Sequence, residues 1–318
     1  MSTIPSTSEQ VRVPYTVVGR RQPIPPDRDV SLSCVLLSRG GRQFKAGYFK
    51  ELLTLGFDEI ISLEHAQSGY DVEELIRKFP EIRFIIIHER ASVGEEVNIG
   101  IGESGARFVF VLWNDMRIIP GSLSLRFKEN LAGSGLLCIV PVLLNLKHET
   151  LPSIQAPAFF RNLLKVLPLA PQSDSMKTLF PFDYCGIYNR ERFFQCGGFD
   201  SRIKSPYWQK MDFGFRAQLW GEKILASLSL KVSYLGDIPV EDTTPDEYYP
   251  LFYLKNLAVK LRGEAAILPA HQFFQYLFTS GGNVFSSLKK FREIRNWVRA
   301  NSPRFRYDAR RIIEQWEV

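Results

Sequence analysis

The first half of the chain alternates short apolar runs with segments of helical periodicity. Uninterrupted apolar runs predict buried strands, and apolar residues spaced three or four apart predict helices. The predicted strands are 31–37, 59–63, 82–87 and 108–112, and the helices between them are 44–55, 71–78 and 94–104. Strands and helices that alternate at this spacing predict a doubly wound α/β domain, in which a mostly parallel sheet carries helices on both faces.

The strand predicted over 108–112 delivers Asn114 and Asp115 into a loop that is closed by Pro120. In open α/β sheets, ligands bind at the carboxyl ends of the strands. Asp115 is therefore well placed to hold a metal ion or a polar ligand. The alternative is that Asp115 only begins a turn, which is a common position for aspartate.

The pattern is less regular in the second half. Residues 136–146 predict a further strand, in which Pro141 marks an edge or a bulge. Residues 150–182 are interpreted as an insertion on the substrate side, with a covering helix as the alternative. The remaining elements are a strand at 184–188, a helix at 190–196, a turn at 197–200, a helix at 211–220 and strands within 223–235.

Composition sets the domain organisation. With 318 residues, of which 45% are hydrophobic, the chain can form one large domain with an appendage. We expect a flexible arm at 1–28, which is rich in Ser, Thr and Pro, then a domain at 29–262 and a helical extension at 263–318. No secretory signal or transmembrane run is recognisable, and no cysteines show metal-site spacing, so a cytoplasmic protein with reduced thiols is expected.

The net charge of +6 is concentrated at the C-terminus. Residues 285–318 contain nine Lys or Arg and four Asp or Glu, a net of +5, so the rest is nearly neutral and nucleic acid is not an expected partner. One helix face there is apolar: Val284, Leu288, Phe291, Ile294 and Val298. Residues 284–311 could make a peripheral contact with the inner membrane surface, or the apolar face could pack on the preceding domain.

Several motifs carry a family resemblance. They are, in order, Asn98-Ile-Gly-Ile101, Asn114-Asp115, Gly197-Gly-Phe-Asp200, Asp212-Phe-Gly-Phe-Arg216 with Gly221, and the Tyr-rich segment 248–256. Over residues 31–262 their order and spacing resemble the family 2 glycosyltransferases of GT-A fold. The resemblance implies a hexosyltransferase-like enzyme of glycan or polysaccharide assembly. It would transfer a sugar, with inversion, from a nucleotide-sugar donor to a glycan or lipid-linked acceptor hydroxyl.

The resemblance also implies a nucleotide-binding set. Glu64, at the end of the second predicted strand, would contact the nucleoside, and its alternative is a solvated charge at the end of a strand. Ser38, Asn98 and Asn114 complete the predicted set, although Asn114 also suits a turn. Arg39 could contact the diphosphate or could be an ordinary surface arginine.

The predicted metal site departs from the family pattern. Asp115 matches the last acid of the family's metal-binding motif, but Trp113 replaces the first. The family's late metal-binding histidine corresponds here to Glu241 or Asp242. Oxygen ligands suit hard cations, so Asp115, Glu241 and Asp242 are the predicted ligands of Mg²⁺ or Mn²⁺. The alternative for the last two is that they are loop charges.

The predicted catalytic acids depart further. Where the family has Glu-Asp-x-Asp, this chain has Gln209-Lys-Met-Asp212, which puts Lys210 at the position of the general base. A lysine is protonated at neutral pH unless it is buried, so it is a poor base. Asp212 is the predicted catalytic acid nearest the acceptor, with helix capping as its alternative role. Lys210 supports a second hypothesis, that the protein is a catalytically inactive glycosyltransferase-like scaffold or a partner in a glycan-assembly complex.

Overall fold

The computed structural model describes residues 13–19, 30–39, 45–66, 72–160, 163–263, 265–280 and 283–316. The predicted starts of two helices, at residues 44 and 71, fall outside these ranges. Most of the arm predicted for 1–28 also lies outside them. Among the described helices, none combines the length and the apolar character needed to cross a membrane.

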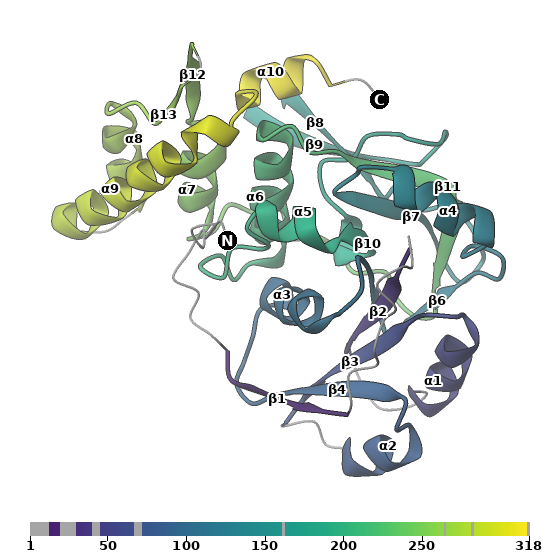
Figure 1. Ribbon diagram of the computed structural model, residues 1–318. Coiled ribbons are helices and arrows are strands. Elements are labelled where there is room, and N and C mark those ends of the chain that lie inside the picture. The colour runs from purple at the N-terminus through teal and green to yellow at the C-terminus, as the bar shows by residue number, and fades with distance from the viewer. Residues whose placement is uncertain are drawn as a thin grey trace.

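The described residues form one nine-stranded sheet with the order β1-β4-β3-β2-β5-β10-β7-β11-β6 (Figure 1). Its strands are β1 Tyr15–Val18, β2 Leu32–Leu37, β3 Glu59–His65, β4 Ile82–Ile87, β5 Phe108–Trp113, β6 Met116–Ile118, β7 Cys138–Leu144, β10 Gly186–Asn189 and β11 Ile224–Tyr234. Strands β4, β3, β2 and β5 are mutually parallel, as predicted. Strand β10 runs antiparallel between β5 and β7, and β11 is parallel to β7. The sheet is therefore parallel from β4 to β5, has an antiparallel edge strand in β1, and is mixed from β10 onward.

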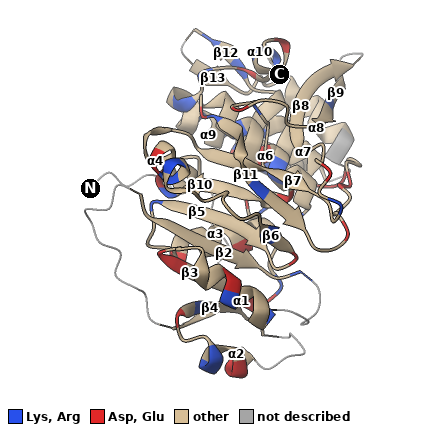
Figure 2. Cartoon of the chain, turned by 90° about the vertical axis from the view of Figure 1, so that its right-hand side faces the viewer, with Lys and Arg blue, Asp and Glu red and all other residues tan. Residues whose placement is uncertain are grey.

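Helices cover both faces of the parallel half. They are α1 Lys45–Thr54, α2 Val72–Lys78 and α3 Val93–Glu103, and α4 Leu125–Gly133 follows β6. On α1, the Phe49 ring packs 5.9 Å from the Phe84 ring of β4. Figure 1 shows α3 on the other side of these strands, where Gly100 lies against Val35 and Leu63. Strands β2, β5 and β10 contain no Lys, Arg, Asp or Glu (Figure 2), as burial on both faces requires.

The structure corrects two predicted elements. The described part of residues 150–182 contains no covering helix but a hairpin of β8 Ile154–Phe160 and β9 Leu163–Leu169, because Pro157 and Pro168 disfavour a helix interior and are tolerated in edge strands. Within the predicted N-terminal arm, Tyr15–Val18 is instead a strand that pairs with β4. The bulge interpretation of Pro141 holds, since the register between β7 and β11 shifts directly after Pro141.

A second core lies beyond the sheet and joins the C-terminal extension to the domain. Its elements are α6 Pro206–Leu219, α7 Tyr249–Phe252, a π-helix Tyr253–Leu257, β12 Lys260–Arg262, β13 Ala265–Ile267, α8 Gln272–Ser280, α9 Val284–Asn301 and α10 Ala309–Glu314, with a 3₁₀ turn at Ser302–Arg304. Helix α5 Arg190–Gln195 and a 3₁₀ turn at Phe182–Tyr184 belong instead to the sheet core, through Phe193 and Tyr184. Helix α6 serves both cores, because Phe213 packs into the sheet core and Phe215 into the second. On α9, Phe291, Ile294 and Val298 are buried in the second core. These three residues of the apolar face thus pack on the protein, which is the second of the two alternatives given for this face.

Helix α6 begins at Pro206, before the predicted start at residue 211. Proline suits the first turn of a helix, where its missing N–H is not needed. Gln209, Lys210 and Asp212 consequently lie inside a helix and not on a loop. Residues two apart on a helix point to nearly opposite sides. Lys210 and Asp212 therefore cannot face the same site, as they could if they lay on a loop.

We predict opposite effects for the same substitution at two helical glycines. In Gly214→Ala on α6, the new methyl group would collide with the backbone carbonyl of Leu179, so the free energy of unfolding should fall by about 1–3 kcal/mol. In Gly47→Ala on α1, nothing lies within 4 Å of the added carbon, and alanine should stabilise the helix by about 0.5–1 kcal/mol. Urea unfolding of both variants measures this, and a neutral Gly214→Ala would contradict the packing of α6.

Candidate functional site

The carboxyl ends of β2 and β5 lie side by side and are joined by Asn114. The Asn114 side-chain oxygen accepts a hydrogen bond from the backbone N–H of Arg39 at 2.8 Å, and the backbone N–H of Asn114 donates to Leu37 at 2.9 Å. This brings Ser38 and Arg39, at the end of β2, next to Asp115, at the end of β5. Three predicted site residues therefore meet where parallel strands end, as the sequence indicates.

Arg39 bridges two carboxylates at this edge of the sheet. Its guanidinium group lies 3.9 Å above the Trp113 ring and contacts Asp115 at 3.5 Å and Asp183 at 2.6 Å. Burial alone would lower the pKa of Arg39, but the two carboxylates outweigh it and the pKa is raised. Trp113 thus supplies the surface on which this cation rests. Arg39 is thus a half-buried arginine with two acidic partners, and its contact with a diphosphate stays a prediction.

Asp183 is a residue of this site that sequence reasoning missed. Its carboxylate also accepts a hydrogen bond from the Tyr234 hydroxyl at 2.9 Å, and its backbone carbonyl accepts one from the Trp113 indole at 2.8 Å. Its backbone is left-handed (φ 51°, ψ 31°), and so is that of Tyr184 (φ 60°). Strained backbone of this kind clusters at functional sites. Burial raises the pKa of Asp183 more than Arg39 lowers it.

Lys210 lies near this cluster and forms an ion pair with Glu241. The Lys210 side chain is only 3% exposed, and its ammonium group lies 5.1 Å from the ring centre of Tyr184. The Lys210 side chain thus lies between a carboxylate and an aromatic ring, both of which attract an ammonium group. Asp242, the next residue after Glu241, is fully exposed and bonds only to its neighbour Thr244 in the described structure.

The predicted metal ligands do not come together. No group of three or more His, Cys, Asp or Glu side chains suited to a metal ion exists in the part of the chain that the structure describes. Asp115 keeps one buried oxygen, Oδ1, without a partner there, but Arg39 binds the other and Lys210 holds Glu241. Burial nevertheless raises the pKa of Asp115. The residues present therefore do not fit a metal ion held by Asp115, Glu241 and Asp242.

Glu64, the predicted nucleoside contact, is fully buried at the end of β3. It pairs with Lys45 and accepts a hydrogen bond from Ser62 at 2.7 Å. The alternative of a solvated charge is therefore wrong, while the nucleoside contact stays a prediction. Next to it, His65 contacts Glu96 at 3.3 Å. Burial lowers the pKa of His65, and burial together with Glu95 raises the pKa of Glu96 to about 8, so at neutral pH this contact is not an ion pair.

Asn98, predicted to bind the nucleotide, supports the Gly197–Asp200 turn. Its side chain exchanges two hydrogen bonds with the backbone of Phe199, at 2.8 and 2.9 Å. Gly198 has a φ of +61°, and a β-carbon there would meet the Asn98 side chain, so glycine is required. The turn is the one that the sequence predicts, but Asn98 lies against it and not among the residues around Arg39.

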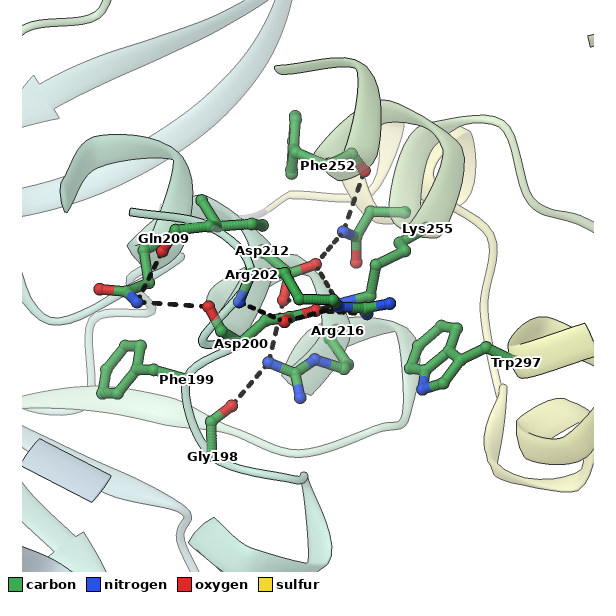
Figure 3. Close-up of polar contacts among 12 residues, drawn as sticks. Gly198, Phe199, Asp200, Arg202, Gln209, Asp212, Arg216, Phe252, Lys255 and Trp297 are labelled. Carbon is green, nitrogen blue, oxygen red and sulfur yellow. Dashed lines mark hydrogen bonds and ion pairs between the residues drawn. The ribbon is translucent and has the colours of Figure 1, made fainter. Parts of the chain in front are cut away.

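Asp212 lies in a buried ion network on the other side of α6 (Figure 3). Its carboxylate pairs with Arg216 at 3.0 Å and Lys255 at 2.8 Å, and accepts a hydrogen bond from Asn256 at 2.9 Å. The side chain has no exposed surface. A general base must reach the proton that it abstracts, and this carboxylate is enclosed by fixed partners. The catalytic role of Asp212 stays a prediction, and its surroundings suit a structural role.

The network continues through Asp200. Lys255 also contacts Asp200 at 2.7 Å, and Arg202 binds Asp200 at 2.6 Å. Burial by itself would raise the pKa of Asp200, but Lys255 and Arg202 hold it well below its usual range. Arg216 donates to the carbonyls of Cys196 and Gly198, which fixes the start of the glycine turn. The family-like Gly-Gly-Phe-Asp and Asp-Phe-Gly-Phe-Arg motifs are thus two halves of one buried network.

We predict that Asp212→Ala lowers the free energy of unfolding by about 3–5 kcal/mol, because Lys255 and Arg216 would stay buried with less compensating charge. Chemical denaturation measures the change. The exposed Asp237→Ala removes the same charge and should leave the unfolding midpoint where it is. An Asp212→Ala variant as stable as the wild type would contradict the structural role of this network.

Glu96 provides a pH test of the site. Between pH values near 4.5 and 8, folded Glu96 holds a proton that the unfolded chain releases, so stability falls as the pH rises. Glu96→Gln removes this dependence. Relative to wild type, the variant should gain up to about 3 kcal/mol between pH 5 and pH 7, at about 1.4 kcal/mol per pH unit. Urea unfolding across this range measures the difference. The exposed Glu89→Gln is the control, and parallel curves for wild type and Glu96→Gln would contradict the raised pKa.

Comparisons with known proteins place the fold. No protein-family model matches the chain, and no curated protein sequence matches it. The structure is similar to a crystal structure of GalNAc-T7 with UDP, GalNAc and Mn²⁺, with a TM-score of 0.55 and 14% identity over 85% of this chain and 55% of that one. It is also similar to TarS from S. aureus, with a TM-score of 0.49 and 14% identity over 79% of this chain and 42% of that one.

A further similar structure is TarS 1–349 in complex with UDP-GlcNAc, with a TM-score of 0.46 and 11% identity over 86% of this chain and 73% of that one. The chain spans about half the length of GalNAc-T7 and of full TarS. Likeness at such low identity concerns the fold alone, and of these structures only GalNAc-T7 has a TM-score above 0.5. This chain has the predicted α/β fold of the GT-A-type glycosyltransferases, with a large central sheet and helices on both faces.

Proposed function

We propose that this protein is a glycosyltransferase that moves a sugar, with inversion, from a nucleotide-sugar donor to a hydroxyl of a glycan or lipid-linked acceptor. One observation carries the proposal: Arg39, Asp115 and Asp183 meet at the carboxyl ends of adjacent parallel strands in a GT-A-type fold. This is the edge at which open α/β sheets bind their ligands. The UDP in the similar GalNAc-T7 structure supports a nucleotide as the ligand here.

The roles follow from position and charge. Ser38, Asn114 and Glu64, at the ends of β2, β5 and β3, form the nucleotide-binding set, and Arg39 is the cation nearest to where a diphosphate would lie. Asp115 and Asp183 are the carboxylates next to it. The two cations Arg39 and Lys210 and the three carboxylates Asp115, Asp183 and Glu241 sum to a formal charge of −1. Arg39 must therefore turn from its carboxylates toward the diphosphate, or a further cation must accompany the donor.

A second function, a non-catalytic partner in glycan assembly, is favoured by the environment of Lys210 and Asp212. Lys210 stands at the position of the general base and is paired with Glu241. Asp212 is enclosed by Arg216, Lys255 and Asn256. Direct transfer with inversion requires a base beside the acceptor hydroxyl, and neither residue offers one in this arrangement. The two functions differ in turnover and not in nucleotide binding.

We predict that at least one nucleotide among UDP, GDP, dTDP, CMP and their common sugar conjugates raises the melting temperature. Ligand at a hundred times its Kd adds about 2.7 kcal/mol of stability, which corresponds to a shift of several degrees. Arg39→Gln should reduce the shift, because it removes the cation nearest to where the diphosphate would lie. Arg310→Gln is the matched control, since Arg310 is exposed and paired with Glu314 on α10.

The screen is run in EDTA and again with Mn²⁺, which shows whether a divalent ion strengthens binding. The donor that binds is then incubated with acceptors, and release of free nucleoside diphosphate is followed. Binding with release supports the transferase. Binding without release favours the non-catalytic partner. No shift with any nucleotide would contradict the proposed site at β2 and β5.

A further inference from the structure

The end of the C-terminal extension exposes a set of large apolar side chains. They lie on α8 and at the start of α9, and the second core does not cover them. Phe278 is 85% exposed and Phe285 82%, while Phe274 is 64% and Val284 53% exposed. Single exposed apolar residues are common on protein surfaces, but a local group of this size marks an interaction site. We refer to Phe274, Phe278, Val284 and Phe285 as the aromatic end.

The packing of α8 on α9 explains why these side chains face outward. Phe273 and Tyr276 of α8 place their rings 5.5 and 6.5 Å from the ring of Phe291 on α9. Phe274 and Phe278, which are one helical turn apart, consequently share a different face of α8. Helix α9 buries Phe291, Ile294 and Val298 in the second core, as noted above. The apolar stripe that the sequence predicts is thus used for packing, and the aromatic end is a separate set.

Cations accompany the aromatic end along α9. At 100° per residue, Phe285, Lys289, Arg292 and Arg299 fall on one outward face, and all four are exposed. Helices α8 and α9 together contain five cations, Lys289, Lys290, Arg292, Arg295 and Arg299, against Glu293 alone, a net charge of +4. Exposed phenylalanine and a row of cations therefore occupy the same side of one helix.

We propose that the aromatic end of α8 and α9 binds the surface of a membrane that contains anionic lipids. Phe278 and Phe285 enter the boundary between headgroups and acyl chains, while Lys289, Arg292 and Arg299 contact anionic headgroups. This pairing of apolar and basic groups is typical of interfacial helices. Protein interfaces, by contrast, are depleted of lysine at their core, and here the exposed Lys289 lies one helical turn after the exposed Phe285. The proposal stands independently of sugar transfer.

Sedimentation of the full chain with lipid vesicles tests the proposal. We expect binding to vesicles of phosphatidylcholine mixed with phosphatidylglycerol and little binding to phosphatidylcholine alone. Phe278→Ser combined with Phe285→Ser should lower the bound fraction about tenfold, because apolar burial supplies part of the affinity. Lys289→Gln combined with Arg292→Gln should lower the preference for phosphatidylglycerol, because two of the three cations on this face are removed, and added salt should weaken wild-type binding.

The control is Leu125→Ser combined with Leu146→Ser, since these side chains are 74% and 63% exposed on the sheet domain. It should bind vesicles like the wild type. Thermal unfolding establishes that every variant is folded. The proposal would be overturned if the wild-type protein did not bind phosphatidylglycerol vesicles. It would also be overturned if the variant with both Phe278→Ser and Phe285→Ser bound them as well as the wild type. Self-association that depends on Phe278 and Phe285 without vesicle binding would overturn it as well, because the aromatic end would then be a protein contact.

Discussion

The architecture depends on one buried ammonium group, that of Lys255. It lies between the carboxylates of Asp200 and Asp212, and the indole ring of Trp297 stacks over it at 4.9 Å. These partners belong to the glycine turn, α6 and α9, so a single charge joins the sheet domain to the C-terminal extension. A charge removed from water is tolerated only when it is paired and hydrogen-bonded, and the network meets that condition with both carboxylates. The same constraint fixes the orientation of α6.

The orientation of α6 decides what the candidate site contains. Because Asp212 faces the network, Lys210 faces the opposite side, toward Glu241 and the aromatic residues around Tyr184. Gln209 lies between these directions and connects α6 to α3, since its side-chain oxygen accepts from the backbone of Gly94 at 2.9 Å. A helix that is buried on every side cannot be adjusted locally to move an acid toward an acceptor. The unusual lysine is therefore built into the packing of the domain.

At the ends of β2 and β5, as in the network around Lys255, a cation is paired with two carboxylates. Arg39 lies where a bound cation would neutralise Asp115 and Asp183, and its stacking on Trp113 holds it there. Trp113 and Arg39 are thus linked parts of one arrangement. An anionic donor of the proposed kind would have to replace the contacts of Arg39 with its own. The described residues show no preformed set of three metal ligands at this edge.

The sequence by itself determined the parallel half of the sheet, the helices on its two faces and the meeting of Ser38, Asn114 and Asp115. Local rules suffice for these, because apolar runs form buried strands and parallel strands end at one edge. The turn at Gly197–Asp200 was also predictable from local sequence, because glycine suits its left-handed backbone. Tertiary structure alone decided the partner of Arg39, the strained position of Asp183 and the enclosure of Asp212. Each depends on contacts between residues far apart in the chain, as between Arg39 and Asp183, and no local pattern encodes such a pairing.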